Sequence, residues 1–160
     1  MAYTTIDDPT AYFQTKLWTG NGGTQSITLD GSENMQPDWV WIKQRSEVRG
    51  HNIQDSVRGA TKYIDSRSTG AEATVSNTLT SFDSNGFSVG SYDDVNKSSQ
   101  TYVAWNWKAG GSASSNSDGD VTSSVSANTT AGFSIVKFTS ASSSGAMTVG
   151  HGLGATPQVV

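Results

Sequence analysis

The sequence predicts an all-β fold. Two observations carry this prediction: apolar and aromatic residues recur in short runs of strand length, and no window shows the three-and-four spacing of a long amphipathic helix. The 160 residues include 17 Gly, 9% aromatic residues and only 15% charged residues. This composition indicates a folded chain whose solubility rests on hydroxyl and amide groups rather than on charge.

The first expected strands flank a turn of small residues. Residues 12–19 and 26–29 are predicted to pair across residues 20–23, which contain three glycines. Residues 39–43 then form a run of β-branched and aromatic side chains that is typical of a buried strand. The one expected helical turn spans residues 56–62.

The clearest predicted hairpin is centred on Asn85 and Gly86. Both residue types tolerate positive φ, which a tight two-residue turn requires. Apolar runs at residues 79–82 and 87–89 flank this pair. We therefore expect these two runs to form adjacent antiparallel strands.

Two pairs of tryptophans occupy alternate positions, Trp39 with Trp41 and Trp105 with Trp107. Each pair shares one face of its strand. Exposed indoles would form a platform for sugar rings, but aromatic side chains also dominate the burial in protein cores. Because residues 102–108 alternate, with Ala104, Asn106 and Lys108 opposite the indoles, we expect both pairs to lie in the core.

Trp18 is the better candidate for an exposed tryptophan. Gln14 and Lys16 share its face of the expected strand, so that face is polar. An exposed Trp18 beside such residues would suit sugar binding, whereas its repeat equivalent, Phe138, favours a packing role.

The composition changes after Lys108. Residues 109–131 contain few large apolar side chains and are predicted to form a flexible connector or a thin edge strand. A shift of 120 positions then superimposes the start of the chain on its end without a gap, and the equivalent pairs are Phe13 with Phe133, Trp18 with Phe138 and Pro37 with Pro157. Either any two glycine-separated hairpins resemble each other or the chain contains an internal repeat, and we favour the repeat.

The repeat predicts the organisation of the chain. Residues 132–160 correspond to the first hairpin of a second module, and the matched strand ends at residues 159–160. We therefore interpret the chain as the front part of a longer protein of tandem β-domains.

The composition also excludes several function classes. A net charge of −4 cannot provide the basic surface that nucleic-acid binding requires. No apolar stretch is long enough for a membrane span, and the N-terminus lacks the pattern of a signal peptide. The chain has no Cys and only two His. Disulfides, thiol nucleophiles and Cys-based zinc sites are therefore excluded.

His51, Asp55 and Arg58 form one candidate catalytic cluster. An acid, a base and a guanidinium at this spacing could support hydrolysis. No second carboxylate stands at a defined distance for glycosidase chemistry. We interpret Asp55 and Arg58 as an ion pair that stabilises a turn, with His51 on an exposed strand.

Loop carboxylates provide a second set of candidates, because Ca²⁺ sites are built from such oxygens. The segment of residues 83–86 resembles part of a calcium loop but lacks the distal Glu, so we interpret it as an Asx turn. Residues 150–154 are glycine-rich, but no helix or Lys follows them, and we interpret them as a turn rather than a phosphate site. The acidic candidates are Asp83, Asp93, Asp94, Asp118 and Asp120.

Several longer motifs resemble one known group of proteins, the repeat-containing virion proteins of marine bacteriophages. The matching segments are residues 3–9, 12–15, 36–43, 55–62, 82–87, 102–111 and 149–154. These proteins are tail fibre or structural proteins built from repeated modules of concanavalin-A-like (laminin-G-like) appearance. The resemblance implies an antiparallel β-sandwich of the jelly-roll type and carries no known catalysis. In that family the second copy normally continues past the position of residue 160.

Together the residues and the resemblance predict a non-enzymatic structural component of a phage particle, the N-terminal attachment part of a tail fibre or spike. Residues 1–11 would form an extended arm that docks on a neighbouring subunit, residues 12–108 the sandwich, and residues 109–131 the connector. Truncation of residues 1–11 is expected to abolish incorporation into virions. We expect no catalytic, cofactor-binding or metal-binding residues.

The expected partners are other virion proteins, contacted through the arm and strand edges, and further copies in a homo-oligomer, by resemblance a trimer. The expected location is the particle surface, with no nucleic-acid partner and no membrane insertion. The alternatives are a lectin-like module for host surface glycans, a glycan hydrolase with two facing carboxylates, and a capsid decoration protein.

Overall fold

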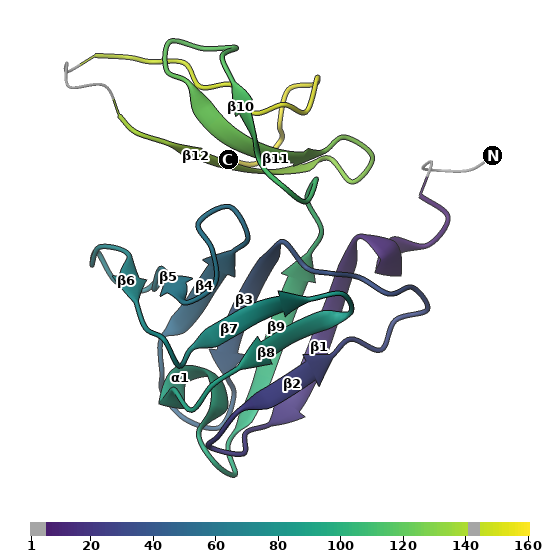
Figure 1. Cartoon of the computed structure of the whole chain (residues 1–160), viewed down its shortest axis with the longest axis vertical. Helices are drawn as coiled ribbons and strands as arrows, with labels where there is room; N and C mark the ends of the chain where they lie inside the picture. The colour runs from purple at the N-terminus through teal and green to yellow at the C-terminus, as the bar shows by residue number, and fades with distance from the viewer. Residues whose placement is uncertain (1–5, 141–144) are drawn as a thin grey trace.

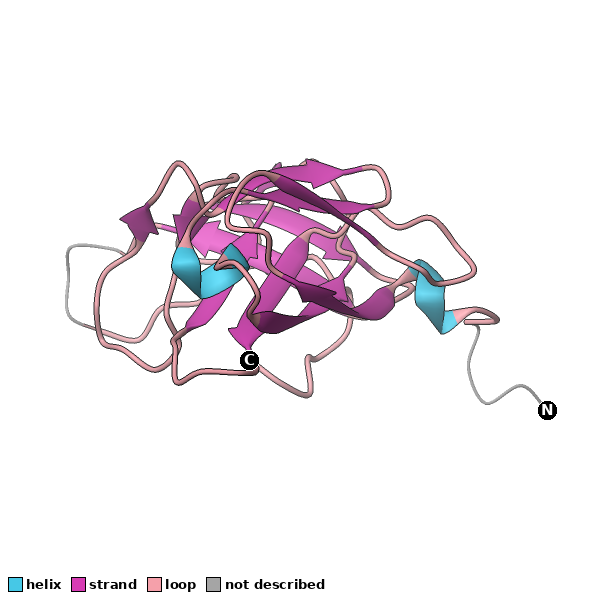
Figure 2. Ribbon diagram, turned by 90° about the horizontal axis from the view of Figure 1, so that it is seen from below, coloured by secondary structure: helices cyan, strands magenta, loops and turns pink. Residues whose placement is uncertain are grey.

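The computed structural model describes residues 6–140 and 145–160, and it confirms the all-β prediction (Figure 1, Figure 2). Nearly all regular structure in this part of the chain is antiparallel strand. No helix among the described residues has the length and apolar character that a membrane span requires. The elements in chain order are η1 (Pro9–Ala11), β1 (Phe13–Thr19), β2 (Gln25–Thr28), β3 (Trp39–Gln44), β4 (His51–Asp55), β5 (Lys62–Tyr63), β6 (Ala73–Thr74), β7 (Leu79–Asp83), β8 (Gly86–Val89), α1 (Asp93–Asn96), β9 (Thr101–Trp107), β10 (Ser114–Asn116), β11 (Ser123–Asn128) and β12 (Phe133–Phe138).

The main body is a sandwich of two sheets. A four-stranded sheet, in the order β1-β9-β3-β4, faces a three-stranded sheet in the order β2-β8-β7. The core between them contains fully buried aliphatic and aromatic side chains from both sheets. Its members are Ile27, Val40, Ile42, Leu79, Phe87, Val89, Val95, Tyr102 and Ala104. Burial of this apolar surface is the main stabilising contribution to the sandwich.

The expected hairpin of residues 12–19 and 26–29 is wrong. β1 pairs with β9, whereas β2 pairs with β8 in the opposite sheet. The intervening turn is instead fixed to the end of β9, because Gly20 N–H donates to the Gln100 carbonyl (2.8 Å) and Gly20 C=O accepts from Ser99 N–H (2.9 Å). The small residues of this turn therefore carry the chain from one sheet to the other.

The hairpin at Asn85 and Gly86 is confirmed as β7 and β8. Gly86 has a φ of +125°, and a Cβ atom there would lie 2.1 Å from the Ile27 carbonyl oxygen. Only glycine fits, since both the conformation and the close approach of β2 exclude a side chain.

The segment of residues 109–131 is not a flexible connector, and the expected alternative, a thin edge strand, is confirmed for β10. It contains β10 and β11, and β11 pairs with β12 to form a three-stranded sheet above the sandwich (Figure 1). Backbone hydrogen bonds and small buried side chains replace large apolar residues here. Ser126 is buried, accepts from Gly110 N–H (3.0 Å) and donates to the Gly111 carbonyl (2.7 Å).

The expected second hairpin, within residues 132–160, does not form between β12 and residues 147–149. β12 pairs with β11 instead, while Val149 forms an isolated parallel bridge with Val121. β11, which precedes β12 in the chain, therefore pairs with β12 where the repeat predicted residues 147–149.

The short helical elements also differ from expectation. Residues 56–62 contain only a turn, in which Gly59 N–H donates to the Asp55 carbonyl (3.0 Å), and α1 lies elsewhere in the chain. The expected extended arm lies partly outside the described residues, at 1–5. Its end is not extended, because η1 forms there and Asp8 accepts hydrogen bonds from Thr10 and Ser32.

Candidate aromatic binding face

The two tryptophan pairs lie on the outer face of the four-stranded sheet, and the prediction that they form the core is wrong. In β3, Val40 and Ile42 point into the sandwich and are fully buried, while Trp39 and Trp41 point outward. The inner positions of β9 hold three other side chains, Tyr102, Ala104 and Asn106. Strands with apolar residues on both faces do not reveal which face is inside, and the space left by the opposite sheet decides it.

Trp18 has the packing role that its repeat equivalent, Phe138, favoured, and not the exposed role. It packs against the core, with its ring stacked on Tyr102 (centroids 5.3 Å apart) and edge-on to Phe87 (5.8 Å). The polar neighbours on its face are engaged: Gln14 is buried, and Lys16 pairs with Asp30 at 2.8 Å. Trp18 is therefore not a candidate for binding sugars.

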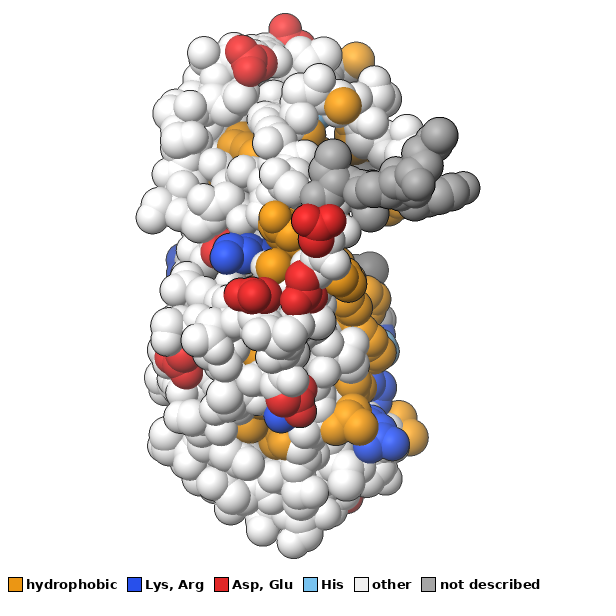
Figure 3. Space-filling model, turned by 90° about the vertical axis from the view of Figure 1, so that its right-hand side faces the viewer, with side chains coloured by type: hydrophobic (Ala, Val, Ile, Leu, Met, Phe, Trp, Pro, Cys, Tyr) orange, Lys and Arg blue, Asp and Glu red, His pale blue; other side chains and the backbone are white. Residues whose placement is uncertain are grey.

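The register of the sheet arranges the outward aromatic side chains in rows. One row places Phe13, Trp107 and Trp39 side by side, and the next places Trp105 beside Trp41. Ring centroids are 4.8 Å apart for Phe13 and Trp107, and 5.8 Å apart for Trp41 and Trp105. In the space-filling view, hydrophobic side chains form a continuous band along this side of the sandwich (Figure 3).

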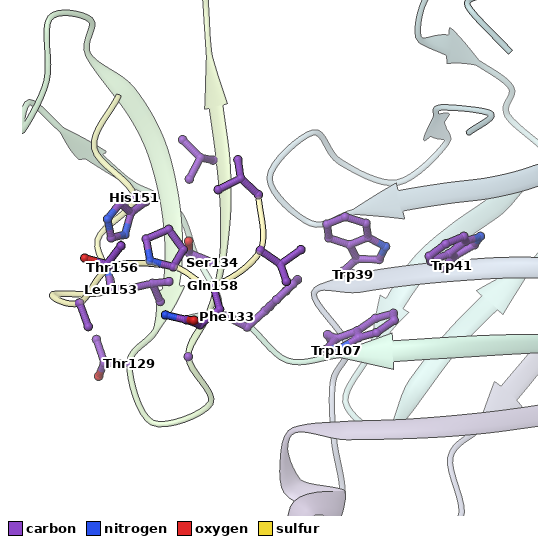
Figure 4. A pocket seen from close by; sticks show the side chains of 16 residues that line it. Trp39, Trp41, Trp107, Thr129, Phe133, Ser134, His151, Leu153, Thr156 and Gln158 are labelled. Atoms are coloured by element: carbon purple, nitrogen blue, oxygen red, sulfur yellow. The ribbon is translucent and has the colours of Figure 1, made fainter. Parts of the chain in front are cut away.

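The sheet of β10, β11 and β12 closes one end of this aromatic face. Phe133 of β12 contacts Trp39 (centroids 5.6 Å apart) and stacks on Trp107 (6.2 Å). A groove of about 970 Å³ lies between the tryptophans, β12 and the last residues of the chain (Figure 4). Its polar rim includes Thr129, His151, Thr156 and Gln158.

Away from Phe133 the face is open. Leu17 is 56% exposed, and Trp41 is only partly buried. The Trp41 indole N–H donates to His51 Nδ1 (2.7 Å), which fixes both rings against each other. The Trp41 ring is therefore held in one orientation before any ligand binds.

Comparison with known proteins gives a family for this fold. Residues 8–160 match the family described as "Domain of unknown function (DUF7483)". The chain belongs to this family. No curated protein and no solved structure matches it. The family match covers both the sandwich and the sheet of β10, β11 and β12.

The candidate cluster of His51, Asp55 and Arg58 is divided in this DUF7483 chain. Asp55 and Arg58 form a close ion pair, and Arg58 also donates to the Ile53 carbonyl (3.0 Å). Asp55 Oδ1 accepts from Arg58 N–H (2.8 Å), which stabilises the turn after β4. His51 lies at the opposite end of β4 and binds Trp41. The structural interpretation of the ion pair is confirmed.

The loop carboxylates do not converge on one point. Among the residues that the structure describes, no group of three or more His, Asp or Glu side chains is arranged to hold a metal ion. Asp83 accepts from the hydroxyls of Ser81 and Ser88 (2.7 Å each), which ties β7 to β8. These bonds come from side chains and not from the backbone N–H that the expected Asx turn requires. Asp120 accepts from Thr148, whose side-chain and backbone hydrogen bonds lower the pKa of the carboxyl.

Three other candidates have local partners as well. Asp93 and Asp94 both pair with Arg49, at 3.3 and 3.5 Å. Asp118 accepts from the side chain of Asn116 (3.0 Å). These pairs hold loops in place and leave no carboxylate cluster.

Residues 150–154 form the expected glycine turn, with Gly152 at a φ of +71°. Leu153 N–H donates to His151 Nδ1 (3.2 Å). The sequence did not predict that His151 and Leu153 also line the aromatic groove. Only the packing of the chain end beside β12 brings them there.

Proposed function

We propose that this chain is a non-enzymatic structural component of a bacteriophage virion, part of a tail fibre or spike at the particle surface. It would assemble with other virion proteins and with further copies of itself. The candidate residues for hydrolysis do not act together: Asp55 and Arg58 form an ion pair in a turn, and His51 accepts from the Trp41 indole. This separation favours a structural role.

One observation carries this proposal: β12 repeats β1 in sequence, and its sheet packs on the sandwich. Phe13 and its repeat equivalent Phe133 both contact Trp107, so the start of the second unit is held by the same indole as the start of the first. A junction packed by aromatic rings is stiffer than a free linker. Stiff tandem units agree with the resemblance to fibre proteins.

The test is to locate the chain in a particle. Purified phage that encodes it would be imaged with gold-labelled antibodies raised against residues 12–138. We expect gold on the tail fibres or spikes. Particles that lack the label, with the chain found only in the infected-cell lysate, would contradict the proposal, and gold on the capsid would indicate a decoration protein.

The aromatic groove favours a second candidate function, a lectin-like module for host surface glycans. Indole faces stack on sugar rings, and the hydroxyl and amide groups of the rim suit sugar hydroxyls. Binding would be measured by tryptophan fluorescence during titration with host glycans. Trp107→Ala should weaken binding by about tenfold or more, equivalent to ~1.4 kcal/mol, whereas Leu17→Ala outside the groove should not. Saturating glycan without a fluorescence change would contradict this candidate.

A further inference from the structure

β1 has an open edge with free backbone groups. It is the outermost strand of its sheet, paired with β9 alone among the described strands. The ladder with β9 is bracketed by hydrogen bonds from Lys108 N–H to the Tyr12 carbonyl (2.9 Å) and from Gly20 N–H to the Gln100 carbonyl (2.8 Å). Hydrogen-bonded pairs alternate in an antiparallel ladder. The backbone groups of the even-numbered residues therefore bond to β9, and those of Phe13, Thr15 and Leu17 point to the open side. The Thr19 carbonyl accepts from the Gln25 side chain (3.3 Å).

The repeat of β1 has a strand on the corresponding edge. β12 pairs with β11, and Asn128 and Phe133 close their hairpin. The closing pair of a hairpin is hydrogen-bonded, and every second pair after it is too. β12 therefore binds β11 through Phe133, Ile135 and Lys137, whose equivalents 120 positions earlier are Phe13, Thr15 and Leu17. These are the residues at the open edge of β1.

The same shift assigns a segment to that edge. β11 corresponds to residues 3–8, and the turn after each segment is alike: Thr10 and Ala11 are identical to Thr130 and Ala131. Each turn also has a side-chain oxygen that accepts from a nearby backbone N–H: Asp8 Oδ1 accepts from Thr10 N–H two residues on (2.8 Å), and Asn128 Oδ1 accepts from Ala131 N–H three residues on (3.0 Å). Residues 3–8 thus carry the repeat equivalent of the strand that β1 lacks.

The described part of the chain's own segment, residues 6–8, does not take that place. Asp8 is held by the Ser32 hydroxyl (2.5 Å) and is not paired with Phe13, and residues 6–8 lead away from β1 (Figure 1). We propose that the open edge of β1 binds residues 3–8 of a neighbouring copy as an added antiparallel strand. The biological role of this contact rests on the proposed function. The contact itself can be tested with the purified chain alone.

The register of β11 on β12 fixes the register of this contact. The hydrogen-bonded pairs would be Asp8 with Phe13, Ile6 with Thr15, and Thr4 with Leu17. Ile6 of the neighbour would then lie between Phe13 and Leu17, which are 37% and 56% exposed in the single chain. Covering these two side chains adds hydrophobic stabilisation to the main-chain hydrogen bonds of strand addition.

Two variants separate the arm from the edge that receives it. A chain that begins at Asp8 lacks the arm and keeps the edge. Thr15→Pro removes the N–H at the centre of the edge, leaves the β9 ladder intact and keeps the arm, since proline is tolerated at the solvent side of an edge strand. Thr15→Val is the matched control, because it changes the side chain but keeps the N–H.

Molar mass in solution, measured by light scattering, gives the result. The full chain and Thr15→Val should each form an oligomer of at least twice 16.8 kDa. The shortened chain and Thr15→Pro should each be monomeric, and their mixture should form a one-to-one heterodimer joined by one arm and one edge. Near-ultraviolet circular dichroism checks folding, and Leu17→Lys replaces Thr15→Pro if that variant is unfolded.

A full chain that stays monomeric would overturn the inference, and so would a Thr15→Pro chain that still associates. Neither result bears on the gold labelling of particles. A virion protein that assembles through another contact would be monomeric in light scattering and would still be labelled with gold on the particle. The two proposals can therefore fail independently.

Discussion

At the scale of single residues, the sandwich depends on buried amides as much as on apolar side chains. Asn106 lies on the inner face of β9, where its side chain donates to the Gln14 carbonyl (3.0 Å). Gln54 and Asn52 reach the buried Thr78 hydroxyl from β4. An alternating pattern that treats Asn106 as an outward residue therefore assigned the faces of β9 incorrectly. Each of these amides has at least one specific partner, which offsets part of the cost of burying it, although Gln54 Oε1 and Asn106 Oδ1 accept no hydrogen bond among the described residues.

Asn96 is the clearest case, and its loss should be costly. Its side chain is fully buried and donates to Asn21 Oδ1 (2.9 Å) and to the carbonyls of Gly23 (2.7 Å) and Gly90 (3.0 Å). We expect Asn96→Ala to lower the free energy of unfolding by about 2–3 kcal/mol, since it leaves buried polar groups unpaired. Urea titration measures this. Asn34→Ala, at an exposed position, is the control and should change stability by less than about 0.5 kcal/mol.

Asp94 predicts a pH dependence of stability. Burial raises the pKa of its carboxyl, although Arg49 at 3.5 Å acts in the opposite direction. The native state therefore holds this proton more tightly than the unfolded state, and stability falls as pH rises through the folded-state pKa. Asp94→Asn should be more stable than the natural chain at neutral pH and should lose this advantage below the ordinary range of aspartate. A gain that is constant across thermal melts at neutral and acidic pH would contradict the prediction.

At the scale of the elements, strand positions could be predicted but strand partners could not. The Asn85–Gly86 hairpin is a local signal, and it is confirmed. The partners of β1 and β2 lie at least 58 positions away in sequence. Nothing in the turn between these strands specifies a change of sheet, because that change is favourable only when β8 and β9 are present to complete the ladders.

The assignment of faces can be tested with two aliphatic residues of one sheet. Ile42 points inward and is fully buried, whereas Leu17 points outward and is largely exposed. We expect Ile42→Ala to lower the free energy of unfolding by about 2–5 kcal/mol through lost burial and a cavity. Leu17→Ala should cost less than about 1 kcal/mol. Similar losses for the two variants in guanidinium titrations would show that the faces are assigned incorrectly.

At the scale of the whole molecule, an aromatic contact joins two bodies of different composition. The sandwich has a core of large side chains, while the sheet of β10, β11 and β12 contains mostly small ones. Phe133 of this sheet is tilted against Trp39 and stacks on Trp107. The groove exists because these bodies meet at one end of the aromatic face only.

Phe133→Asp should uncouple the two bodies without unfolding the sandwich. A carboxylate between the indoles would carry a large desolvation cost, so the contact would open. Hydrogen exchange followed by mass spectrometry should then show faster exchange in β10–β12 and unchanged protection in β3 and β9. Val48→Asp, at an exposed apolar position, is the control. Equal loss of protection in both bodies would mean that they fold as one unit.

The all-β class and the Asn85–Gly86 hairpin could be predicted from sequence alone, because strand periodicity and turn chemistry are local properties of the chain. The repeat stays a prediction, and the hairpins that it implied do not form. Tertiary structure decided which face of each strand is buried, since β3 and β9 carry apolar side chains on both faces and the opposite sheet fills only one side. It also decided that the tryptophans form a surface. His151 and Leu153 reach the groove only because the chain end packs beside β12, a contact that no local pattern encodes.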